Sequence, residues 1–207
     1  EANDAGILII GNSNEPKGLD PHLVSGVLES NIIRALFEGL CVEDPAIDGK
    51  ALPGVAMKWT PNKEFTEWTF DLNPDAKWSD GEDVTAHDFV FSYKRMLSPD
   101  PNWPAQYSEM LYFLKNAQEY NKGKITDFAQ VGAKAVDKHT LLLTLRGPIP
   151  YLPELTKHYT WYPVPEHIVL KHGKINTAFS SQWTRPGNLV SNGPFQLKTW
   201  TTNHKIE

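Results

Sequence analysis

The first fifty residues combine one compact apolar run with one helical pattern. Residues 6–11 hold four consecutive aliphatic side chains between two glycines, which is typical of a strand buried on both faces. Residues 30–37 place apolar side chains at helical spacing, and Gly39 is a fitting stop, so this stretch is predicted to be a helix. The proline, aspartates and glycine in residues 44–49 indicate a turn.

The middle of the chain follows a different period. Residues 67–72 alternate strictly, which predicts a half-buried strand with Trp68, Phe70 and Leu72 on its inner face. A turn at residues 73–75 is expected to end this strand.

A helix with its own start signal is predicted next. Thr85 and Asp88 have the spacing of a capping box, in which side chains satisfy the first free amides of a helix. The apolar stripe of this helix consists of Phe89, Tyr93, Met96 and Leu97.

The second half of the chain is punctuated by prolines. Residues 131–136 and 140–145 predict a hairpin around Asp137 and Lys138. The proline-rich stretch 148–165 is predicted to be a crossover connection rather than a compact element. Residues 195–197 and 199–207 alternate like strands and end the chain.

Composition narrows the class of protein. A length of 207 residues suits one large domain or two small ones, and no apolar run approaches the ~20 residues that span a bilayer. The net charge of −5, without a basic stripe, argues against a nucleic-acid partner. Cys41 allows no internal disulfide and reads as a buried small hydrophobe. The N-terminus lacks the features of a signal peptide, so either the protein is not exported or its signal has been removed.

No catalytic or metal-binding signature is present. Phosphate loops, nucleophile elbows and paired cysteines are absent, so no cofactor is expected. His158, His167 and His172 lack the tight pairing of zinc ligands and are better explained as solvated or capping histidines. Residues 80–83 resemble part of a calcium loop, but a turn before a helix is the simpler interpretation because the alternating ligands are missing.

A glycoside hydrolase is the one enzymatic alternative. Such enzymes set paired carboxylates among aromatic rings, and acidic residues here surround three tryptophans: Glu64, Glu67, Asp71 and Asp75 with Trp59, Trp68 and Trp78. Strand alternation points Asp71 away from the aromatic face, so solvated carboxylates outside an aromatic core are the simpler arrangement.

Several motifs resemble a known family along nearly the whole chain, from about residue 7 to the last. They are, in order, Leu19-Asp-Pro-His22, Glu29-Ser-Asn31, Leu36-Phe-Glu-Gly-Leu40, Pro53-Gly-Val-Ala56 with Trp59, Trp68-Thr-Phe-Asp-Leu72, Ala76-Lys-Trp-Ser-Asp-Gly81, Val84-Thr-Ala-His-Asp-Phe-Val90, Ala135-Val-Asp137, Pro148-Ile-Pro-Tyr151, Pro163-Val-Pro165 and Asn192-Gly-Pro-Phe195. The pattern resembles the oligopeptide-binding receptors of peptide ABC transporters, solute-binding family 5.

The resemblance implies a mixed α/β fold, one lobe of a periplasmic-binding-protein-like class II architecture. Its first-lobe subdomain, with a mixed sheet, would comprise residues 1–42 plus 163–207. A smaller α+β subdomain would be inserted at 43–162. The chain is less than half the length expected of the family, so we expect an N-terminal fragment whose second lobe, which in the family carries the acidic partner of the peptide amino terminus, follows residue 207.

The resemblance also suggests ligand-binding residues. The loop that lines the cleft in the family corresponds to Ser25, Gly26 and Val27, whose main chain would pair with an extended peptide. Ser25 stands where the family often has an acidic residue, so a charge contact there is not expected to carry over. Tyr107 is the best match for an aromatic that stacks on the ligand, although it could equally pack under its own helix.

The leading hypothesis is therefore a non-catalytic periplasmic, or membrane-anchored extracellular, receptor that delivers oligopeptides to the permease of an ABC importer. The full-length protein would be a monomer. The same fold could instead bind an oligosaccharide, a nickel complex or haem, and the hydrolase remains the enzymatic alternative.

Overall fold

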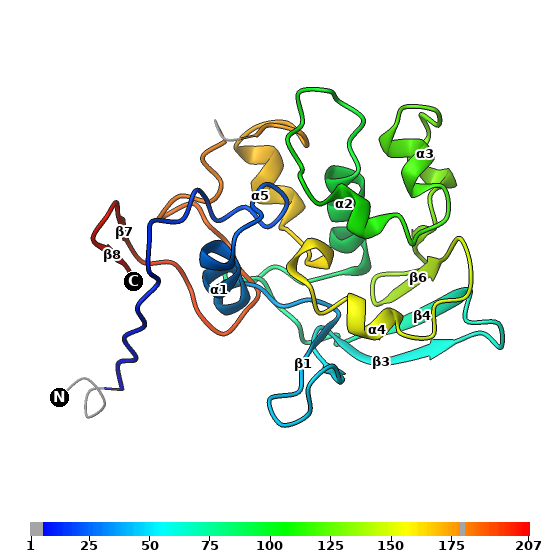
Figure 1. Cartoon of the computed structure of the whole chain (residues 1–207), viewed down its shortest axis with the longest axis horizontal. Coiled ribbons are helices and arrows are strands. Elements are labelled where there is room, and N and C mark those ends of the chain that lie inside the picture. Colours follow the sequence, from blue (N-terminus) through cyan, green and yellow to red (C-terminus); the bar gives the residue numbers. More distant parts are fainter. Residues whose placement is uncertain (1–5, 179–180) are drawn as a thin grey trace.

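The computed structural model describes residues 6–178 and 181–207, which form an antiparallel four-stranded sheet, two small strand pairs and a set of short helices around them (Figure 1). In chain order these elements are α1 (Val27–Leu36), β1 (Cys41–Glu43), β2 (Ala51–Pro53), β3 (Ala56–Pro61), β4 (Glu67–Leu72), α2 (Ala86–Met96), η1 (Ser108–Leu111), α3 (Ala117–Asn121), η2 (Phe128–Gln130), β5 (Ala133–Ala135), β6 (Thr140–Thr144), α4 (Leu152–Leu155), η3 (Tyr159–Trp161), α5 (Glu166–Lys171), β7 (Trp200–Thr201) and β8 (Lys205–Ile206).

The four-stranded sheet confirms the strand and hairpin predictions for the middle of the chain. Its order is β3-β4-β6-β5, so β4 is a central strand with partners on both edges. Phe70 of β4 is fully buried opposite Leu141 of β6, whereas Glu67 and Asp71 are exposed. The alternation in the sequence therefore reports the two faces of this strand correctly.

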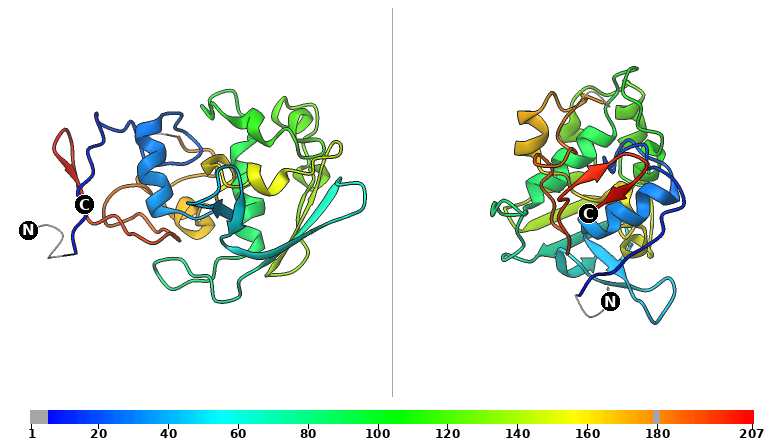
Figure 2. Two further views of the ribbon diagram at one scale, coloured as in Figure 1. Left: turned by 60° about the horizontal axis from the view of Figure 1, so that its bottom comes forward. Right: turned by 90° about the vertical axis from the view of Figure 1, so that its left-hand side faces the viewer.

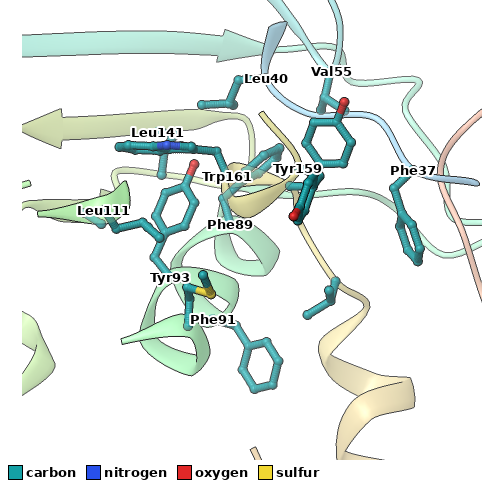
Figure 3. Close-up of a cluster of buried hydrophobic side chains, with 14 of the residues drawn as sticks. Phe37, Leu40, Val55, Phe89, Phe91, Tyr93, Leu111, Leu141, Tyr159 and Trp161 are labelled. Atoms are coloured by element: carbon teal, nitrogen blue, oxygen red, sulfur yellow. The ribbon is translucent and has the colours of Figure 1, made fainter. Parts of the chain in front are cut away.

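Helix α2 covers the sheet and begins where the capping box predicts. The Asp88 carboxylate accepts the Thr85 N–H at 2.8 Å and the Thr85 hydroxyl at 2.9 Å. Tyr93 of the predicted stripe is fully buried, and its ring meets that of Trp161 edge to face, with centroids 5.5 Å apart (Figure 3). The capping box therefore predicts the start of α2 correctly, and the predicted apolar stripe is the face of α2 that packs into the core.

The proline-rich stretch 148–165 is compact, so its prediction as a mere crossover is wrong. It forms α4 and η3, and it buries Tyr159, Trp161 and Tyr162 in the main core (Figure 3). Pro153 lies in the first turn of α4, where the missing N–H has no helical acceptor to lose. The prolines here shape short helices and do not prevent structure.

Residues 6–11 are not the buried strand that their composition predicts. They carry no strand assignment, and Ile7, Leu8, Ile9 and Ile10 are 54, 76, 79 and 71% exposed. A strand buried on both faces needs neighbouring strands and covering layers. Within the described residues no strand pairs with this segment, which extends from the body at the same end as β7 and β8 (Figure 2).

Smaller differences concern the ends of elements. Helix α1 begins at Val27, three residues before the predicted start. Residues 195–197 form no strand, whereas residues 199–207 contain the short β7–β8 pair. Cys41 is fully buried, as expected.

The structure confirms a mixed α/β arrangement, and all strand pairs in the described residues are antiparallel. The division into 1–42 plus 163–207 and 43–162 remains a prediction. None of the described helices is long and apolar enough to cross a membrane.

Candidate functional site

The loop that leads into α1 is shaped by a glycine and a buried acid. Gly26 precedes the helix in an extended conformation, and a Cβ on it would lie 2.0 Å from Oε2 of Glu29. Glu29 is 3% exposed, and its Oε1 accepts the Lys17 N–H at 2.7 Å. A side chain at position 26 would therefore displace the Glu29 carboxylate from its place against the loop and from its bond to the Lys17 N–H.

Two tyrosines from distant parts of the chain hold this loop. The Tyr107 hydroxyl donates to the Ser25 carbonyl at 3.1 Å, and the Tyr159 hydroxyl donates to the Val24 carbonyl at 3.3 Å. Their ring centroids lie 6.5 Å apart. Burial, followed by the neighbouring Tyr107, raises the pKa of Tyr159 to about 12, so its hydroxyl remains a donor at neutral pH.

The structure thus brings together all four residues expected to bind a ligand. Within the described part of the chain, the N–H groups of Ser25, Gly26 and Val27 donate to no other residue. The Val27 side chain is 75% exposed. These free amides, an exposed aliphatic side chain and a partly exposed tyrosine together form what we call the ligand wall. Successive N–H groups of an extended backbone point in alternate directions, so an extended ligand would pair with those that face it.

His158 belongs to the same wall, although the sequence suggested no ligand-binding role for it. Its ring stacks on Tyr159 with centroids 4.4 Å apart, and it meets the Tyr107 ring edge to face at 6.2 Å. Its Nδ1 accepts the Thr160 N–H at 3.4 Å and lies 2.9 Å from the Thr160 hydroxyl oxygen, so the ring is held at the start of η3. Burial, together with the Arg34 charge, lowers the pKa of His158. The position of His158 beside Tyr107 follows from the packing of η3 against Tyr107, which no pattern in the sequence indicates.

The three histidines considered as metal ligands are kept apart. His158 caps η3, and Nε2 of His167 lies 2.7 Å from Oδ2 of Asp80. His172 ends α5 and accepts the Ser181 hydroxyl through its carbonyl at 3.4 Å. Among residues 6–178 and 181–207, no three metal-ligating side chains gather at one point.

The carboxylates of the hydrolase alternative also fail to form a site with the aromatic residues. Glu67 and Asp71 are exposed on β4, while Trp68 of the same strand is buried on the other face. Glu64 and Asp75 are exposed as well. The strand therefore separates the acids from the ring that would stack on a sugar.

The wall is open rather than enclosed. A cavity of about 110 Å³ lies next to it, but neither Ser25, Gly26, Val27 nor Tyr107 lines that cavity. An open wall binds a ligand weakly unless a second surface covers the other side, since buried contact area is then small.

Comparison with known proteins gives one consistent family. Residues 50–207 match the family model of the bacterial extracellular solute-binding proteins, family 5 Middle. The chain is 43% identical over 205 residues to the periplasmic oligopeptide-binding protein OppA of Salmonella typhimurium, covering 98% of this chain and 35% of that protein. It is 46% identical over 203 residues to OppA of Escherichia coli, covering 96% and 35%.

A solved structure has the same fold. The crystal structure of Haemophilus influenzae OppA in complex with RPPGFSPFR matches with a TM-score of 0.82 and 38% identity, covering 94% of this chain and 36% of that one. The chain thus spans about 35% of the length of the curated relatives it matches.

Proposed function

The chain belongs to the bacterial extracellular solute-binding proteins of family 5, and on this premise we propose that it supplies one ligand-binding wall of a receptor for oligopeptides. The receptor would act in the periplasm and deliver its ligand to the permease of an ABC importer. The proposed role is binding without catalysis.

The observation that carries the proposal is the run of three free amides at residues 25–27, beside Tyr107. Every peptide offers the same main-chain donors and acceptors, so bonds to this run would not depend on the ligand's sequence. A partly exposed aromatic ring adds apolar contact that tolerates many side chains. Together these features suit a receptor of broad specificity.

The proposal includes a second wall. A ligand that contacts two lobes only when they close favours the closed state by its differential affinity. One open wall leaves half of the ligand in water, and the remaining contacts are too few to offset its lost freedom. In this proposal residues 1–42 plus 163–207 form the subdomain that carries residues 25–27, and residues 43–162 form the inserted subdomain that carries Tyr107. The complete receptor would be monomeric.

The test is calorimetric titration of the complete natural polypeptide that carries these residues. Unrelated peptides of several lengths are compared with an oligosaccharide, a nickel complex and haem. We expect micromolar or tighter binding of several peptides, which corresponds to about −8 kcal/mol or more. Binding of one of the other solutes, with no heat from any peptide, would overturn the peptide assignment and leave the fold family intact.

A further inference from the structure

A buried ionic cluster joins three distant segments of the chain. We call it the buried bracket, and it consists of Asp20, His22, Arg95, Trp103 and Trp183. Arg95 is fully buried at the end of α2, and Asp20 is 6% exposed. Buried charges of this kind are costly to desolvate, so their geometry has to be nearly complete.

The contacts within the bracket are nearly saturated. Arg95 binds the Asp20 carboxylate with both terminal nitrogens, Nη1 to Oδ1 at 2.9 Å and Nη2 to Oδ2 at 2.6 Å. The indole N–H of Trp183 donates to the same Oδ2 at 3.1 Å. The third guanidinium nitrogen, Nε, donates to the Ile175 carbonyl at 2.9 Å. The guanidinium carbon lies 4.6 Å from the centre of the Trp103 ring.

His22 completes the bracket as a neutral acceptor. Its Nδ1 lies 2.9 Å from Nη1 of Arg95, and since a guanidinium can only donate, Nδ1 carries no proton. Burial, followed by the Arg95 charge, lowers the pKa of His22 to about 3. Burial alone would raise the pKa of Asp20, but Arg95 holds it below its ordinary value. The bracket therefore contains one ion pair and one neutral imidazole at neutral pH.

The bracket is attached to both halves of the ligand wall. On one side, Asp20 accepts the His22 N–H through Oδ1 at 3.0 Å and the Leu23 N–H through its carbonyl at 3.1 Å, which closes the turn that leads to Ser25. On the other side, Arg95 stacks on Trp103, four residues before Tyr107. The hydrogen bond from Tyr107 to the Ser25 carbonyl spans the gap between the two sides.

From this arrangement we infer that Asp20 and Arg95 are positioning residues for peptide binding: they fix the loop 25–27 against Tyr107 without touching the ligand. The inference rests on the proposed function. Two segments that are far apart in sequence meet at the wall, and a bidentate pair fixes both distance and orientation between them. The free amides of residues 25–27 are then held in place before the ligand arrives, which lowers the cost of ordering them.

The single substitution Asp20→Asn would not test this inference, because it leaves a buried guanidinium without its counter-charge and destabilises the fold strongly for that reason alone. The informative variant is the double substitution Asp20→Asn with Arg95→Met. It removes both charges at similar volume, and the asparagine oxygen can still accept one of the two N–H groups that Asp20 binds, that of His22 or that of Trp183. We expect this variant to unfold within a few degrees of the wild type, since paired buried charges are often replaceable without loss of stability.

The matched control is Asp83→Asn. Asp83 pairs with Lys77 and Lys138 on the surface, away from the wall, so the control breaks an ion pair without touching the bracket. Both variants are made in the complete natural polypeptide. Peptide affinity is measured by calorimetry. Hydrogen exchange without ligand is measured at the amides of Leu23 and Ser30, which donate to the Asp20 and Gly26 carbonyls on either side of the loop.

The expected result is an affinity at least about tenfold weaker for the double variant, with faster exchange at the Leu23 and Ser30 amides and no change in the control. Unchanged affinity and exchange in a folded double variant would overturn the inference. If the wild type binds no peptide, the proposed function fails, and exchange alone decides: faster exchange at the Leu23 and Ser30 amides supports the positioning of the loop, and unchanged exchange refutes it. If the double variant does not fold, Arg95→Lys, which keeps the charge but loses the fork, replaces it under the same criteria.

Discussion

The four-stranded sheet and residues 6–11 are both rich in aliphatic residues, but these side chains are buried in the sheet and exposed in residues 6–11. Leu141 of β6 is fully buried between neighbouring strands and α2, whereas Leu8 is 76% exposed. Both stretches have the composition of strands. The difference lies in their surroundings, because β6 has a partner strand on each edge and residues 6–11 have none among the described residues.

This contrast shows what an apolar run can and cannot specify. Composition determines that a segment gains by burial, at about 25 cal/mol per Å² of apolar area. The composition of a segment does not determine which other elements cover it. In the sheet, the covering elements are close in sequence, since residues 56–145 contain all four strands and helix α2.

The largest expected effect compares the same substitution in the two regions. Leu141→Ala should lower the free energy of unfolding by about 2–5 kcal/mol, since it leaves a cavity in a closed core. Leu8→Ala should change it by less than about 0.5 kcal/mol, since the side chain is mostly in water. Urea denaturation of both variants measures the difference. Equal losses would contradict the contrast and mean that residues 6–11 are buried in solution.

The next effect is the pH dependence of stability, which a substitution in the buried bracket should change and a substitution in residues 6–11 should not. His22 has its pKa lowered from 6.5 to about 3, so its neutral form stabilises the fold fully above pH 6.5 and this stability is lost as the pH falls toward 3. About 2 kcal/mol of stability should be lost between pH 7 and pH 5 on this account. Urea denaturation at several pH values should show this slope flattened in His22→Gln. Leu8→Ala, which removes no ionisable group, should keep the wild-type slope, and a slope that His22→Gln does not alter would assign it to other groups.

A smaller effect tests the local signals of the sheet region. Thr85→Ala removes the hydroxyl from the cap of α2 and should lower stability by about 1 kcal/mol. Ser13→Ala, an exposed hydroxyl near the N-terminal segment, should change stability by less than about 0.5 kcal/mol. Thermal or urea unfolding measures both. No loss in the cap variant would mean that packing alone positions α2.

The smallest effect on stability is expected from a charge in the exposed segment, and it should be visible in association instead. Leu8→Lys should leave the free energy of unfolding within about 0.5 kcal/mol of the wild type. It should also reduce self-association of the 207-residue chain, because four exposed aliphatic residues in an extended segment invite pairing with another copy. Sedimentation velocity over a range of concentrations tests this, and an unchanged oligomer distribution would exclude the segment as the contact.

The elements that the sequence predicted well are those with local causes. The alternation around Phe70 and the capping box at Thr85 each depend on residues within a few positions, and both are confirmed. The predictions for residues 6–11 and 148–165 are wrong for two different reasons. A strand at residues 6–11 needs partner strands far along the chain, which its composition does not specify. The helices within 148–165 are too short to leave a periodic pattern.

The candidate site shows the same limit more clearly. The family resemblance supplied residues 25–27 and Tyr107, but nothing in the sequence pairs the Ser25 carbonyl with a hydroxyl 82 positions away. Nor does any local pattern join Asp20 to Arg95, which is 75 positions away. The motif that contains Asp20 is recognisable, but the bonds of its carboxylate to His22 and Arg95 appear only when the chain is folded.

The central claim is that the main chain of residues 25–27 binds peptide. Hydrogen exchange of the complete natural polypeptide, with and without a saturating peptide, tests it most directly. The account predicts strong added protection among the amides of Ser25, Gly26 and Val27, at those that face the ligand, and no added protection in the sheet strand β4. Peptide binding that leaves these three amides exchanging at their unbound rate would contradict it.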